Sequence, residues 1–123
     1  AAYRRQRPLR DVSVEEGMAA ACELGGNLRD AYQWCLRGLA RRPEGEALFE
    51  RAVRLCGAVG GPEEMARLHQ EFLKYRPGHL PAVTGLAEAC RRLGRADEAT
   101  ALDRKADTLR VAASAHLEGT GAA

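Results

Sequence analysis

Residues 77–110 read PGHLPAVTGLAEACRRLGRADEATALDRKADTLR, a stretch that predicts two helices joined by a tight turn. Pro81 suits the first turn of a helix, where its fixed φ and missing N–H carry little cost. Gly94 interrupts the helical spacing. Asp97 and Glu98 then stand early in the second helix, where negative charge is favoured by the exposed amide groups.

The same pattern occurs twice more, because residues 9–42 and 43–76 align with 77–110 at a constant offset of 34 residues and without a gap. Three columns of identical residues recur at this offset: Cys22, Cys56 and Cys90, then Gly26, Gly60 and Gly94, then Arg42, Arg76 and Arg110. A fixed period of this length is the signature of stacked helical units. We therefore expect an all-α chain.

The helix boundaries of the first repeat follow from local signals. Ser13 followed by Glu16 predicts a capping box at the start of the first helix. Met18, Ala19 and Cys22 line one face at helical spacing. Gly25 and Gly26 are expected to end this helix, and Asn27 to cap the next one.

The expected domain organisation follows from the repeats. A basic arm occupies residues 1–8, a single domain occupies 9–117, and a flexible tail occupies 118–123. The domain holds three repeats, at 9–42, 43–76 and 77–110, and its last helix extends to about residue 117.

The period and its landmarks resemble the tetratricopeptide repeat. The segment LAEACRRLGRADEATALDRKA, residues 86–106, carries the plainest match, with Ala87, Gly94, Ala99 and Ala106 in the family's small-residue places. The resemblance covers residues 9–110 and implies a right-handed α-solenoid of three helix-turn-helix repeats. It also implies that the first helices line a concave groove, which binds a peptide or helix of another protein.

The sequence departs from the family at two columns. Cys22, Cys56 and Cys90 stand where the family often has an aromatic residue. Glu15, Phe49 and Val83 stand where a large residue is common. These departures leave the expected fold intact and put the curvature of the superhelix in doubt.

Projection of the first helices predicts which side chains face the groove. The candidate partner-binding residues are Glu16, Glu50, Arg51, Arg54, Thr84, Glu88, Arg91 and Arg92, with Ser13, Ala20, Glu23 and Ala58 on the same faces. Their charge changes from acidic to basic along the chain, so an acidic or C-terminal peptide would meet Arg54, Arg91 and Arg92. The alternative is that these are ordinary solvated charges on exposed helix faces.

A second hypothesis concerns the last helix. Ala99, Leu102, Ala106, Leu109 and Ala113 form a continuous apolar stripe, and the final unit of a solenoid needs a polar cap over such a face. No capping helix is encoded after residue 117. Leu102, Leu109 and Ala113 are therefore a candidate assembly face for a second copy of the chain, with a partner protein or further residues as the alternatives.

Catalytic, metal and cofactor sites are not expected. The four cysteines contain no Cys-x-x-Cys pair, and burial in tight helix packing explains them. A disulfide between Cys22 and Cys35 is the one alternative, and it would imply an oxidising compartment. The three histidines are scattered and form no catalytic arrangement. We predict a binding protein, not an enzyme.

Composition restricts the partners further. The net charge is +2, but the first ten residues carry four arginines and no acid. Aromatic residues are 5% of the chain, too few to stack many bases, so nucleic acid is not the expected partner. No apolar run approaches the ~20 residues that cross a bilayer. A cytoplasmic location is the default expectation, and the richness in Ala, Arg and Gly suggests a bacterial source.

Overall fold

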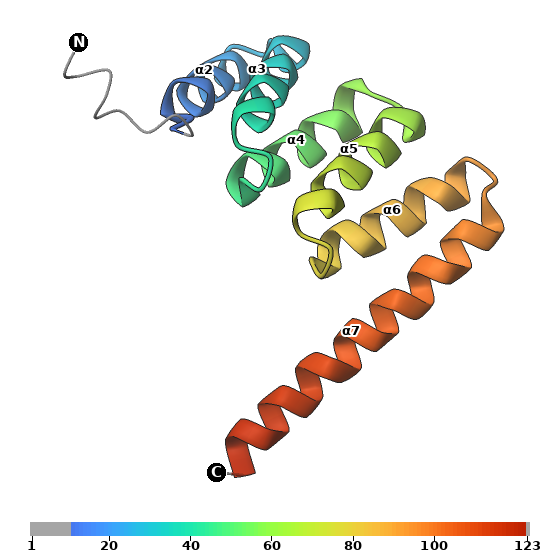
Figure 1. Ribbon diagram of the computed structural model, residues 1–123. Helices are drawn as coiled ribbons and strands as arrows, with labels where there is room; N and C mark the ends of the chain where they lie inside the picture. Colours follow the sequence, from blue (N-terminus) through green and yellow to red (C-terminus); the bar gives the residue numbers. More distant parts are fainter. Residues whose placement is uncertain (1–10, 123) are drawn as a thin grey trace. The chain divides into compact units, whose positions relative to one another are not determined.

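The computed structural model describes the backbone of residues 11–122 and the side chains of residues 11–115. Within that range the chain forms six helices and no strand, which confirms the all-α prediction (Figure 1). The helices are α2 (Ser13–Leu24), α3 (Leu28–Arg41), α4 (Glu46–Val59), α5 (Pro62–Tyr75), α6 (Leu80–Arg92) and α7 (Ala96–Ala122). The basic arm expected at residues 1–8 lies outside the described residues.

The chain divides into two compact units at Gly61 and Pro62. The first unit holds α2, α3 and α4, and the second holds α5, α6 and α7. The division falls between the two helices expected for the second repeat. The single-domain organisation and the right-handed superhelix of three repeats remain predictions.

Two of the helix turns have the same geometry, as the repeat predicts. Gly26 after α2 has a φ of 81°, and Gly94 after α6 has a φ of 77°. At each turn the third amide beyond the helix donates back to a helix carbonyl: Asn27 to Cys22 and Arg95 to Cys90, both at 2.8 Å. This Schellman arrangement needs a residue that tolerates positive φ, and glycine does so without strain.

The other helix boundaries differ in detail from the expected signals. Gly60, in the same column, has an extended backbone with φ −111° and ψ −177°, and Pro62 opens α5 directly after it. The capping box predicted for Ser13 and Glu16 is wrong. Ser13 is the first residue of α2, and its amide donates to Asp11 Oδ1 at 3.0 Å. The carboxylate of Asp11 therefore accepts from the helix start in place of a serine hydroxyl.

Small residues allow close packing in the first unit. Its buried residues include Ala19, Ala31, Tyr32, Cys35, Leu48, Ala52, Leu55 and Cys56. Gly38 of α3 lies so near α4 that an added Cβ would stand 2.5 Å from Leu48 Cδ1. The face expected for α2 is only partly correct, because Ala19 is buried and Cys22 half-buried, whereas Met18 is exposed.

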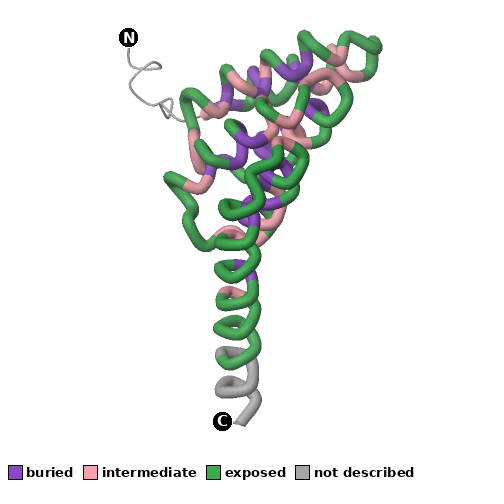
Figure 2. Tube along the Cα trace, turned by 90° about the vertical axis from the view of Figure 1, so that its right-hand side faces the viewer, coloured by how far each residue is buried: buried purple, intermediate pink, exposed green. Residues whose placement is uncertain are grey.

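The second unit packs around an apolar cluster. Its members are Ala66, Leu86, Ala89, Cys90 and Ala99, with Met65, Leu73, Leu93 and Leu102 partly buried against them. Helix α7 continues beyond this cluster, and residues 110–115 are all exposed (Figure 2). The helix ends at Ala122 and not near residue 117, so residues 118–122 are helical where a flexible tail was expected.

Candidate partner-binding site

Helices α2 and α4 are joined by an ionic cluster on the predicted groove side. Arg51 Nη1 donates to Glu23 Oε1 at 2.6 Å. Arg54 Nη2 donates to both oxygens of Glu23, at 2.9 and 2.8 Å. These bonds place α2 and α4 side by side within the first unit, as expected for the first helices of two successive repeats. We call Glu23, Arg51 and Arg54 the α2–α4 cluster.

The α2–α4 cluster holds two guanidinium groups against one carboxylate. Hydrogen bonding from Arg54, with a further contribution from Arg51, lowers the pKa of Glu23. The cluster therefore keeps one net positive charge. It is open to water, because the side chains of Glu23, Arg51 and Arg54 are 25%, 31% and 60% exposed.

The candidate residues that flank this cluster lie on the surface. Glu16 of α2 and Glu50 of α4 are exposed, as are Ser13 and Ala58. Each of the two helices therefore carries an exposed glutamate in addition to its residues of the α2–α4 cluster. Of the predicted residues of the first unit, the structure brings Arg51 and Arg54 to Glu23, and it leaves Glu16 and Glu50 exposed on the same two helices.

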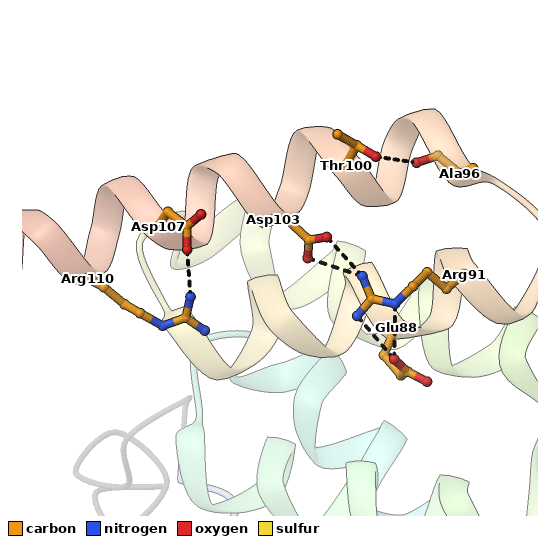
Figure 3. Close-up of polar contacts among 7 residues, drawn as sticks. All are labelled: Glu88, Arg91, Ala96, Thr100, Asp103, Asp107 and Arg110. Carbon is orange, nitrogen blue, oxygen red and sulfur yellow. Dashed lines mark hydrogen bonds and ion pairs between the residues drawn. The ribbon is translucent and has the colours of Figure 1, made fainter.

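In the second unit, Arg91 lies between α6 and α7. Its Nη1 donates to the two carboxylate oxygens of Asp103 at 3.2 and 3.0 Å, and its Nε and Nη2 donate to Glu88 at 3.2 and 3.1 Å (Figure 3). These bonds raise the pKa of Arg91. Arg91 therefore bridges two helices of its own unit.

The remaining candidates of the second unit are divided between surface and backbone. Arg92 is 68% exposed in its side chain and stands 3.8 Å from Glu88. The hydroxyl of Thr84 donates to the carbonyls of Leu80 and Pro81 at 3.2 and 3.1 Å, within its own helix. Arg54, Arg91 and Arg92, which were predicted to meet an acidic peptide, are thus each already paired with a carboxylate of the chain.

The candidate assembly face on α7 is mostly involved in packing. Leu102 is half-buried against the apolar cluster of the second unit, and Leu109 is also half-buried. Ala113 is exposed. The apolar stripe faces α6 because α7 uses it as the second helix of its own repeat. Of the three candidates, only Ala113 presents its side chain at the surface.

Sequence reasoning missed an ion pair between a buried carboxylate, Glu15, and the exposed Arg41. Glu15 is 7% exposed, and Arg41 Nη1 donates to its two oxygens at 2.6 and 3.0 Å. The repeat alignment does indicate that Glu15 is buried, because it shares a repeat column with Phe49 and Val83, which are both buried. A carboxylate at that position needs a cation, which the last turn of α3 supplies.

Metal and thiol chemistry find no support in the described part of the chain. No three His, Cys, Asp or Glu side chains gather there in a way that would hold a metal ion. Cys22 and Cys35 are free thiols, so the disulfide alternative is not realised. Burial raises the pKa of the Cys35 thiol to about 11, which keeps it protonated and unreactive.

Among the helices of residues 11–122, none combines the length and apolar character that spanning a bilayer requires.

Comparison with known proteins gives a fold and no family. No family model matches the sequence, and no curated protein matches it significantly. Among solved structures, the chain is similar to the crystal structure of MamA, a protein that contains tetratricopeptide repeats, with a TM-score of 0.71 and 14% identity. The match covers 87% of this chain and 63% of the MamA chain, so this chain spans less than two thirds of that structure. At this identity the similarity shows a helical-repeat fold only.

Proposed function

We propose that the protein is an interaction module that holds a segment of another protein on the face shared by α2 and α4. One observation carries the proposal. Glu23 holds the two helices side by side through Arg51 and Arg54, and Glu16 and Glu50 are exposed on the same two helices. Stacked helical repeats bury their faces only against neighbouring helices, so long helix faces of this kind are where such folds meet partners.

The α2–α4 cluster favours an acidic segment of the partner. One carboxylate shared by two guanidinium groups leaves donors and a positive charge to spare. A partner carboxylate can take Arg54, which is 60% exposed, while Glu23 keeps Arg51. Glu16 and Glu50 then oppose acidic residues at neighbouring positions, which would limit how such a segment binds.

In the second unit, Glu88 and Arg92 are exposed candidates for a partner contact of that unit. Self-assembly through the last helix has less support as a function. Its candidate residues Leu102 and Leu109 are half-buried within their own unit.

Site-specific photocrosslinking tests the proposal. A photoreactive phenylalanine at Glu50, on the α2–α4 face, is expected to crosslink a discrete protein in the cells that make this chain. The same probe at Gln33, exposed on α3, is the matched control. Adding Arg54→Glu to the Glu50 probe should lose most of the crosslink, because two carboxylates would then face an acidic segment.

Equal crosslinking at positions 33 and 50, or a crosslink at 50 that is indifferent to Arg54→Glu, would rule out the α2–α4 face as the partner site. A crosslink between two copies of the chain at position 50 would favour self-assembly instead.

A further inference from the structure

The edge of α2 carries an apolar stripe that is exposed in the described part of the chain. Val14 is 52% exposed, Met18 is 41% exposed, and Ala21 is also exposed. Their spacing of four and then three residues places them on one face of the helix. Glu23 stands on a different face of α2, so the stripe is separate from the α2–α4 face.

The repeat identifies the positions in α4 and α6 that are equivalent to this stripe. At offsets of 34 and 68 residues the three positions become Leu48, Ala52 and Leu55 in α4, and Ala82, Leu86 and Ala89 in α6. All six of these residues are buried, and none is more than 7% exposed. The same positions are therefore helix–helix interface in the second and third repeats and are open in the first.

The second helix of the preceding repeat covers these positions in both cases. In the first unit, α3 packs on α4 with Gly38 directly against Leu48. In the second unit, α5 packs on α6, and Ala66 lies in one cluster with Leu86 and Ala89. The kind of helix that fits the α2 stripe is therefore known from two examples: an amphipathic helix like α3 or α5.

A glycine on α2 provides room for such a helix. Gly17 shares its repeat column with Gly85 of α6, where an added Cβ would stand 2.4 Å from the His69 ring of α5. At Gly17 no described atom lies within 4 Å of an added Cβ. Gly17 thus leaves the same room beside the stripe that Gly85 leaves for α5, but no described helix occupies it.

A second copy of the chain is a poor occupant, because α7 is polar where it would have to contact α2. The side of α5 that covers α6 carries Ala66, His69 and Leu73, and the equivalent positions in α3 are Tyr32, Cys35 and Leu39, all buried or half-buried. In α7 these positions are Thr100, Asp103 and Asp107, and all three are exposed (Figure 3). This side of α7 is therefore polar and exposed where the same side of α3 and α5 is buried or half-buried.

We propose that the stripe of Val14, Met18 and Ala21 is a docking site for an amphipathic helix of a partner protein. The occupant carries apolar residues at spacings of three and four, with a flat side chain opposite Gly17, as α5 places the ring of His69 opposite Gly85. Docking buries the stripe in the way that α4 and α6 bury theirs.

The two methionines of the chain make the proposal testable on the intact protein. Methyl-labelled methionine gives one signal from Met18 in the stripe and one from Met65 in the cluster of the second unit. The probe is a peptide of residues 61–76, held helical by a side-chain link between exposed positions. We expect it to shift the Met18 signal and to leave Met65 unchanged. A peptide of residues 95–110, linked in the same way and carrying the polar face of α7, is expected to shift neither.

Val14→Glu with Ala21→Glu is expected to weaken the response at Met18 at least tenfold, and both substitutions are at exposed sites, so the circular dichroism of the chain should not change. Equal shifts from both peptides, or a shift at Met65, would overturn the proposal, as would the absence of any shift at Met18. A Met18 signal that changes with protein concentration alone would assign the stripe to a second copy and would also overturn it.

Discussion

Two helix glycines differ in what surrounds them, although both lie inside helices. Gly38 in α3 has Leu48 and Glu15 so near that an added Cβ would stand 2.5 Å from Leu48 Cδ1 and 3.2 Å from Glu15 Cβ. Gly57 in α4 has no described atom within 4 Å of that position. Gly38 is therefore kept by packing, whereas Gly57 only costs backbone entropy.

The two glycines should respond to alanine in opposite directions. Gly38→Ala is expected to lower the free energy of unfolding by about 1–3 kcal/mol, because the methyl group displaces Leu48 from a fully buried position. Gly57→Ala is the matched control and is expected to raise it by about 0.5–1 kcal/mol through helix propensity. Urea unfolding followed by circular dichroism measures both. A Gly38→Ala variant as stable as Gly57→Ala would contradict this account of the α3–α4 contact.

His69 makes stability depend on pH. It is 3% exposed, and burial, with a smaller contribution from the charge of His79, lowers the pKa of His69 from 6.5 to about 4. Between these two values the unfolded chain binds a proton that the folded chain does not. The stabilisation is therefore complete above pH 6.5 and is lost as the pH falls toward 4.

Between pH 7 and pH 5 we expect the contribution of His69 to the free energy of unfolding to fall by about 2 kcal/mol. The measurement is urea unfolding at both pH values for the wild type and for His69→Leu. The quantity compared is the change in the free energy of unfolding between the two pH values within each protein. An effect of repacking that does not depend on pH therefore cancels. Equal pH dependence in the two proteins would show that His69 is not the titrating group.

At the scale of elements, α7 has two parts with different roles. Up to Leu109 its apolar side packs within the second unit, where Leu102 contacts the cluster. From residue 110 to residue 115 every side chain is exposed, Val111 by 68%. The apolar stripe predicted along the helix is thus continuous in sequence but is used for packing only in its first part.

Substitution by glutamate at two positions of the α7 stripe distinguishes packing within the second unit from assembly with another copy of the chain. Leu102→Glu is expected to lower the free energy of unfolding by about 2–3 kcal/mol, since it places a charge against an apolar cluster. Ala113→Glu should change it by no more than about 0.5 kcal/mol, because the site is solvated. Urea unfolding and light scattering after size exclusion report stability and mass. A lower mass for Ala113→Glu than for the wild type would restore the assembly hypothesis.

At the scale of the whole molecule, the first and last helices differ in chemistry. Helix α2 presents exposed Val14, Met18 and Ala21 where later repeats are buried, whereas α7 presents exposed Asp103 and Asp107 where earlier second helices carry buried or half-buried residues. Polar side chains remain solvated on an uncovered helix face, whereas apolar ones gain from burial. Helix α2 is therefore a better candidate than α7 for a docked helix.

The sequence by itself determined the helical class, the 34-residue repeat and most helix boundaries. Those features depend on local signals: glycines that accept positive φ at Gly26 and Gly94, Pro62 at a helix start, and apolar spacing along each helix. It also placed Arg51 and Arg54 on the exposed side of α4, since helical period alone decides which residues share a face.

Only the tertiary structure decided which charges pair and which apolar residues are covered. Glu23 meets Arg51 and Arg54 across about 30 residues of sequence, and Arg91 meets Asp103 on another helix. Period within one helix cannot reveal such partners, because they depend on which neighbour lies opposite. Met18 and Leu102 look alike as apolar positions in a helical pattern. One is exposed and the other packs against a cluster, because burial is set by the adjacent helix and not by the residue itself.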